Sequence, residues 1–128
     1  MKIVAFVCVK NSFKSIISEK FAKEFSNDFI FVSGGSNPAK DLNLEGKEIM
    51  RSMGYSMKGY RPHSLEELPQ KVDYLVTMGC GIECPLMEAK KIINFEMDNY
   101  KGETYEEKIE IVKILKEKVE TLISDISR

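Results

Sequence analysis

The sequence has no excess of basic residues and no long apolar run. Its 19 Lys and Arg residues stand against 20 Asp and Glu residues, a formal net charge of −1, whereas nucleic-acid binders usually carry a basic excess. No stretch approaches the apolar length needed to span a bilayer. The short apolar run at the N-terminus ends in lysine and serine without a small-residue cleavage site. We therefore expect a cytoplasmic protein that binds neither nucleic acid nor a membrane.

Cysteine and histidine are also scarce. Three cysteines, Cys8, Cys80 and Cys84, are an odd number, which in a reducing compartment argues against a structural disulfide framework and favours thiol chemistry or buried apolar cysteines. His63 is the only histidine, and no second Cys/His pair accompanies Cys80 and Cys84 to complete a zinc site. We therefore expect no metal site.

The 128 residues, 43% hydrophobic and 30% charged, have the composition of one ordinary globular domain spanning residues 1–128. Apolar, β-branched runs predict four buried strands. Helical spacing and end signals predict three helices, the last with a T-x-x-E capping box formed by Thr104 and Glu107. The expected strands cover residues 2–7, 29–32, 72–79 and 91–97, and the expected helices cover residues 15–25, 44–54 and 104–126.

Strands that alternate with helices imply right-handed β-α-β crossovers. The predicted fold is therefore α/β, a single three-layer domain with a four-stranded parallel sheet flanked by helices. In such sheets ligands bind beyond the carboxyl ends of the strands. Cys8 ends the first strand, Cys80 follows the third and Asp98 follows the fourth. The pattern predicts that these three positions meet at one edge.

The stretch "CVKNSFKS" (residues 8–15) connects the first strand to the first helix. Such a loop gathers unpaired backbone N–H groups around an anion-sized space, and the helix dipole adds to the attraction. A cysteine at its base, here Cys8, is expected to be a thiolate. Ser12 and Ser15 can donate hydroxyl hydrogen bonds, Lys14 supplies a cation, and Asn11 tolerates a left-handed backbone. This combination indicates nucleophilic attack by sulfur on a tetrahedral oxyanion.

The same stretch resembles the C-x5-R-[ST] loop of low-molecular-weight tyrosine phosphatases and of the arsenate reductases that share their fold. By this resemblance Cys8 is the nucleophile, Asn11 shapes the loop and Ser15 closes it. Glu19 corresponds to a glutamate that the reductases share in their first helix. The residues that the resemblance places around the oxyanion are Asn11, Ser12, Phe13, Lys14 and Ser15.

The resemblance continues over almost the whole chain. "VTMGCGIECP" (residues 76–85) resembles the reductase segment that carries the second and third redox cysteines. "FEMDNYKGETYEEKIEIVKILKEKVETLI" resembles the reductase C-terminal region, which implies that Asp98 is the general acid. "SGG" at residues 33–35 and "NP" at residues 37–38 fall where the family has a Ser-Ala-Gly turn and an Asn-Pro pair.

The chain departs from the family pattern at four positions. Lys14 stands where the family has arginine, so the charge is kept and the fork geometry is lost, at a cost of about 1–3 kcal/mol in the transition state. Asp98 is followed by Asn99 where the family has proline, and Phe13 replaces a common cysteine. His63 lies near the place where some reductases bind potassium through an aspartate, so we expect no potassium site.

The mechanism that the resemblance implies is reduction of arsenate to arsenite. Cys8 attacks arsenate, Asp98 protonates the departing oxygen, and Cys80 attacks Cys8 to release arsenite. Cys84 then carries the disulfide outward to a thioredoxin-like reductant. The resemblance implies no cofactor, and a small monomer is expected.

Three other functions stay open. A phosphatase of the same fold would hydrolyse phosphomonoesters through a phosphocysteine at Cys8, with no need for Cys80 and Cys84. A degenerate, non-catalytic oxyanion binder would follow if Lys14 cannot replace the arginine. A phosphocysteine carrier of the sugar-phosphotransferase kind also places a cysteine and an anion loop after its first strand, but it has no use for Asp98.

Overall fold

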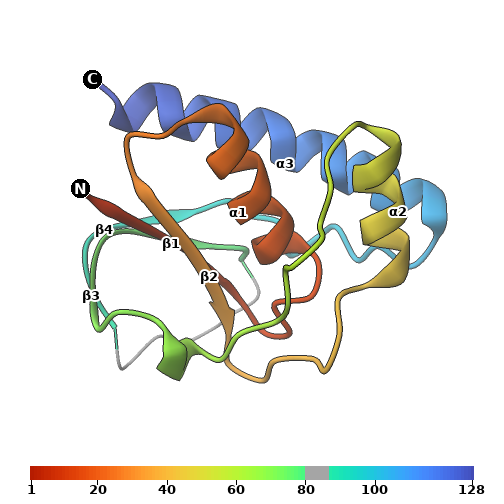
Figure 1. Ribbon diagram of the computed structural model, residues 1–128, viewed down its shortest axis with the longest axis horizontal. Helices are drawn as coiled ribbons and strands as arrows, with labels where there is room; N and C mark the ends of the chain where they lie inside the picture. The colour runs from red at the N-terminus through yellow and green to blue at the C-terminus, as the bar shows by residue number, and fades with distance from the viewer. Residues whose placement is uncertain (80–86) are drawn as a thin grey trace.

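The computed structural model describes residues 1–79 and 87–128 as a parallel sheet with helices packed on it (Figure 1). In these described residues, three α-helices and one 3₁₀ turn alternate with or follow the strands, which is the predicted α/β class. In chain order the elements are β1 (Ile3–Cys8), α1 (Lys14–Phe25), β2 (Ile30–Gly35), α2 (Leu44–Ser52), η1 (Leu65–Glu67), β3 (Lys71–Thr77), β4 (Glu88–Asn94) and α3 (Tyr105–Ile126).

The sheet has the order β2-β1-β3-β4, and all three neighbouring pairs are parallel. This arrangement confirms the predicted four-stranded parallel sheet. β1 is central, paired with β2 on one side and β3 on the other, and Cys8 pairs with Gly35 at the last position of the β1–β2 register. Cys8 therefore leaves the sheet at its carboxyl edge, in the middle of the strand order.

Alternate side chains of β1 pack into two apolar cores of unequal size, one on each face of the sheet. Val4, Phe6 and Cys8 face the larger core, which the three α-helices cover. Ala5 and Val7 face the other way, into a smaller core. Within the described residues, the three α-helices thus cover one face of the sheet, and the short 3₁₀ turn η1 packs on the other. The residues that close this smaller core are Ile3, Val32, Leu65, Leu68, Val72, Leu75, Met87 and Ala89.

α3 follows its sequence pattern closely. Thr104 accepts a hydrogen bond from the backbone N–H of Glu107, and the Glu107 side chain accepts one from the backbone N–H of Thr104, so the predicted capping box is confirmed. The buried residues of the helix are Ile111, Val112, Leu115, Val119 and Leu122. Within residues 1–79 and 87–128, no helix is long and apolar enough to cross a membrane.

The largest differences from the predicted strand boundaries, in β4 and β2, have local reasons. β4 begins at Glu88, three residues earlier than expected, because Glu88 pairs with Lys71 at the start of β3. It ends before Glu96, whose φ of 54° breaks the extended conformation. β2 continues through Gly35 instead of stopping at the glycines. A Cβ at Gly35 would lie 2.4 Å from the carbonyl oxygen of Val9, so only glycine lets the strand approach the loop this closely.

Candidate active site

The loop at residues 8–15 is held from outside by its carbonyl groups. The carbonyls of Cys8, Val9 and Lys10 accept hydrogen bonds from the backbone N–H groups of Ser36, Asn37 and Ala39, and the Ser12 carbonyl accepts one from Asn43. In a planar trans peptide the N–H points opposite to the C=O of the preceding residue. The amides of residues 9–11 and 13 are therefore turned toward the inside of the loop, as an anion cradle requires.

The Cys8 thiol lies at the base of this cradle and is 8% exposed. Its Sγ is 2.8 Å from the Ser15 hydroxyl and 3.1 Å from the backbone N of Asn11, which donates to it. Both groups can donate to a thiolate, the form that attacks and binds. The sulfur therefore has the partners that a nucleophile needs, supplied by its own loop and by the first turn of α1.

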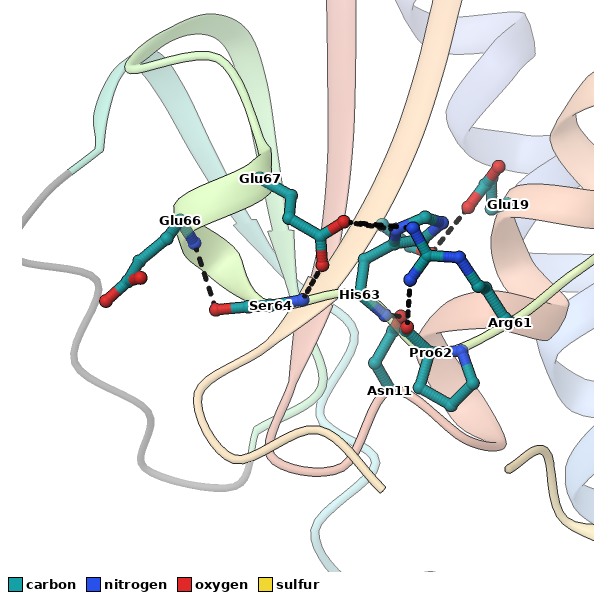
Figure 2. A network of polar contacts seen from close by, with 9 residues as sticks. Asn11, Glu19, Arg61, Pro62, His63, Ser64, Glu66 and Glu67 are labelled. Atoms are coloured by element: carbon teal, nitrogen blue, oxygen red, sulfur yellow. Dashed lines mark hydrogen bonds and ion pairs between the residues drawn. The ribbon is translucent and has the colours of Figure 1, made fainter. Parts of the chain in front are cut away.

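The Asn11 side chain stabilises the loop through hydrogen bonds at both of its polar atoms, one of them to His63 (Figure 2). It is fully buried and has a φ of 51°, the left-handed conformation that the sequence predicts for it. Its side-chain amide donates to Ser15 Oγ at 2.8 Å, and its Oδ1 accepts from the backbone N–H of His63 at 2.8 Å. The His63 carbonyl in turn accepts from Gly35 N at 2.8 Å. Asn11 thus ties the thiol's hydroxyl partner to a segment 52 residues away.

The side chain of His63 faces the surface carboxylate of Glu67 (Figure 2). His63 Nδ1 lies 3.1 Å from Glu67 Oε1, and Arg61 Nη2 lies 3.2 Å from the same oxygen. Glu67 Oε2 accepts the backbone N–H of Ser64 at 2.8 Å. The pKa of Glu67 is lowered to about 2 from its usual 4.5. The main cause is the hydrogen bond with His63, and the second is the hydrogen bond from the Ser64 backbone. This network supports the segment that holds Asn11.

Glu19 is nearly buried beneath the same segment, at 7% exposure. It accepts a hydrogen bond from the Ser33 hydroxyl at 2.5 Å and forms an ion pair with Lys23 Nζ at 2.6 Å. These residues line a cavity of about 290 Å³ that also includes His63 and Glu67. The Lys23 ammonium supplies the positive charge beside the Glu19 carboxylate here.

Asp98 lies on a turn at the end of β4, next to the end of β3. The turn is closed by a hydrogen bond of 3.1 Å from Tyr100 N to the Met97 carbonyl. A Cβ at Gly79 would lie 2.8 Å from Asp98 Oδ1, so the carboxylate is packed against that glycine. Lys14 Nζ donates to the same Met97 carbonyl at 3.0 Å and joins the loop to this turn.

The remaining predicted site residues have different positions. Ser12 is half-buried in the loop, and Phe13 precedes α1 with its ring against Gly46, where a Cβ would lie 2.7 Å from the ring. Because phenylalanine has no polar side-chain atom, it leaves the first-turn amides of α1 to other acceptors. Cys80 and Cys84 lie outside the described residues.

Two residues help to shape the site in ways that their side-chain chemistry does not indicate. His63 acts on the loop through its main chain, and Gly35 acts through the absence of a side chain. A histidine in "RPHS" suggests imidazole chemistry, whereas the contact to Asn11 uses only the peptide group. The "SGG" stretch gave the one available hint, since paired glycines often mark a close backbone approach.

Comparison with known sequences decides the family. The sequence profile described as low molecular weight phosphotyrosine protein phosphatase matches residues 3–124. The chain belongs to this family. The predicted resemblance to it, which rested on the loop, the cysteine pair and Asp98, is therefore confirmed.

Within the low molecular weight phosphatase family, the chain resembles proteins named as arsenate reductases. It is 27% identical to the glutaredoxin arsenate reductase of Synechocystis over 131 residues, which cover 99% of this chain and 100% of the relative. A solved structure described as an arsenate reductase in the phosphate binding state has 25% identity and a TM-score of 0.86, with 98% and 99% of the two chains covered. The thioredoxin-dependent arsenate reductase of Corynebacterium glutamicum shares the fold at 22% identity and a TM-score of 0.77, covering 99% of this chain and 62% of that one.

Proposed function

We propose that this protein is an arsenate reductase that works by a three-cysteine thiol–disulfide relay. The observation that carries the proposal is the Cys8 thiol at the base of a loop whose carbonyls are bound outward and whose amides face inward. The relatives named as arsenate reductases support the same substrate. Asp98 on the neighbouring turn supplies the acid.

The first step is attack of the Cys8 thiolate on arsenic. The inward-facing backbone amides of the loop and the Ser12 hydroxyl bind the oxyanion, the Ser15 hydroxyl donates to the Cys8 sulfur, and the charge of Lys14 lies nearby. A sulfur–arsenic bond forms and one oxygen leaves as water, taking a proton from Asp98. Arsenic is still pentavalent after this step.

The second step reduces arsenic. The Cys80 thiolate attacks Cys8 Sγ, a disulfide forms, and the electron pair of the sulfur–arsenic bond stays on arsenic, which leaves as trivalent arsenite. Cys84 then attacks Cys80 and frees the Cys8 thiol. A dithiol reductant takes over the Cys80–Cys84 disulfide, so two electrons enter for each arsenate reduced.

The reductant follows from the same chemistry. A dithiol protein of the thioredoxin or glutaredoxin kind can deliver two electrons to a protein disulfide. One relative is named for glutaredoxin and one for thioredoxin. We propose a thioredoxin-like partner, a monomeric enzyme and a cytoplasmic location, where such dithiols are kept reduced.

The test is arsenate-dependent oxidation of a reduced thioredoxin system by the purified protein, with a glutaredoxin system run in parallel. Turnover that disappears in Cys8→Ser, Cys80→Ser and Cys84→Ser establishes the relay. Turnover that survives in Cys84→Ser contradicts it. Cys8→Ser serves as the blank, because removing the nucleophile leaves the fold and the other two thiols in place.

A second candidate function is phosphomonoester hydrolysis, favoured by the phosphatase family to which the chain belongs. It uses Cys8 and Asp98 but not Cys84. Hydrolysis of p-nitrophenyl phosphate that is equal in the natural protein and in Cys84→Ser would favour the phosphatase. Phosphate binding without turnover of either substrate would instead indicate an oxyanion binder that has lost activity with Lys14.

A further inference from the structure

The carbonyl of Met97 closes the turn that carries Asp98, and it has two donors. Tyr100 N donates to it at 3.1 Å along the turn, and Lys14 Nζ donates at 3.0 Å from the start of α1. Met97 itself is fully buried, and its N–H donates to the Met78 carbonyl at 3.0 Å. The lysine thus reaches the buried corner of the turn, one residue before the acid.

The turn depends on this corner because its outer half is exposed. Asp98 and Asn99, the two central residues, both face solvent. Asn99 has a free φ, unlike a proline. An ammonium group at the Met97 carbonyl fixes the end from which the Asp98 side chain projects. It also links that end to the helix that follows the Cys8 loop.

We propose that Lys14 is a positioning residue for Asp98, and that its charge reaches a bound oxyanion through space and not through direct ligation. The proposal rests on the proposed function only in giving Asp98 its role as acid. A lysine side chain ends in a single point charge, whereas an arginine fork can hold two oxygens. At this site the point charge is aimed at the Met97 carbonyl.

The first test is structural and needs no turnover. Hydrogen exchange at the Tyr100 amide is measured by NMR in the natural protein, Lys14→Met, Lys14→Arg and Lys101→Met, and the dissociation constant of inorganic phosphate is measured by calorimetry. Lys101 is an exposed lysine directly after the turn, so its variant controls for loss of charge. We expect Lys14→Met to raise Tyr100 exchange about tenfold and to change phosphate affinity less than threefold. Lys14→Arg, which keeps a donor, retains the protection.

Three results would overturn the proposal. A tenfold loss of phosphate affinity in Lys14→Met would show direct ligation. Unchanged Tyr100 exchange would show that the turn does not need the lysine. Equal exchange in Lys14→Met and Lys101→Met would assign the effect to charge alone.

The second test uses kinetics where the protein turns over arsenate. Lys14→Met should lower kcat with KM nearly unchanged, and should add little in an Asp98→Asn background, because it acts through Asp98. Additive losses would contradict the proposal. If the natural protein turns over no arsenate, the proposed function fails, while exchange and phosphate binding still decide the role of Lys14.

Discussion

The loop that holds the nucleophile and the turn that holds the acid both follow parallel strands, yet they are fixed in different ways. The loop at residues 8–15 is bound from outside through four of its carbonyls and from inside through Asn11. The turn at residues 97–100 is fixed at one buried corner, the Met97 carbonyl, and its two central residues face solvent. Many hydrogen bonds thus fix the loop around the sulfur, whereas the hydrogen bonds of the acid's turn converge on one carbonyl.

This difference agrees with what each group has to do. An anion cradle works only if several amides keep their directions before the anion arrives, because reorganising them costs energy in every turnover. An acid needs only to reach one oxygen of the bound group. We infer that the loop keeps its shape when single contacts outside it are lost, whereas the turn responds to small changes at its corner.

The largest effect is expected from Asn11→Ala. The substitution removes one buried and one partly buried hydrogen bond and places alanine at a φ of 51°, so we expect a loss of about 3–5 kcal/mol of unfolding free energy and loss of turnover. Urea denaturation and the arsenate assay measure both.

Asn11→Gly separates the two causes, because glycine keeps the left-handed backbone without the bonds. It should recover only the smaller, conformational part of the stability. Full recovery by glycine would show that the side-chain bonds are unimportant and would break the contrast between the two regions.

The next effect concerns the turn itself. Asp98→Asn keeps the shape and removes the proton, so we expect turnover to fall by about 10²–10⁴-fold with stability unchanged. Phosphate affinity should also be unchanged, because the cradle is made by residues 8–15. A variant that keeps turnover within threefold would remove Asp98 from the mechanism.

Gly79→Ala tests how sensitive the position of Asp98 is to a small added group beside the turn. Gly79 has a φ of 78°, and a Cβ there would lie 2.8 Å from Asp98 Oδ1 and 3.2 Å from Met97 N. We expect about 1 kcal/mol of destabilisation from the backbone, together with about a tenfold loss of turnover as Asp98 is displaced. Gly59→Ala is the matched control, with a φ of 85° and open space around its Cβ position. It should lose stability only, and equal losses of turnover would contradict the displacement.

The sequence predicts the region that is built from regular elements. The four strands, the three helices and the Thr104 capping box follow from periodicity and end signals, because these depend on neighbours in the chain. Cys8, Asn11, Ser15 and their meeting in one loop were also predictable, since the loop is local in sequence. The position of Asp98 at the same edge followed from parallel topology.

The parts that escape prediction are the long-range main-chain contacts. Nothing in the residue type of His63 indicates that its peptide N–H meets Asn11, and Lys14 as an arginine replacement suggested a ligand of the anion, not a donor to Met97. Such contacts depend on how two segments distant in the sequence pack against each other in the folded protein. A lysine with several possible acceptors within reach is therefore the hardest residue to assign from sequence.

The smallest effect is expected at Glu67, the outermost support of the loop. Hydrogen bonds hold its pKa at about 2, below 4.5. A lowered carboxyl pKa stabilises the fold above about pH 4.5, and the contribution is lost as the pH falls from there toward 2. Glu67→Gln should therefore lower the urea midpoint slightly at pH 6 and less at pH 3, since its side chain is 43% exposed.

Glu66→Gln is the control for this small effect, because the Glu66 carboxylate points away from His63 (Figure 2). A pH-dependent difference that is equal in the two variants would reflect surface charge alone. If instead Glu67→Gln lowered turnover tenfold, the loop would depend on a single exposed support, as the turn depends on its corner. The contrast between the two regions holds only if the thiol tolerates this substitution.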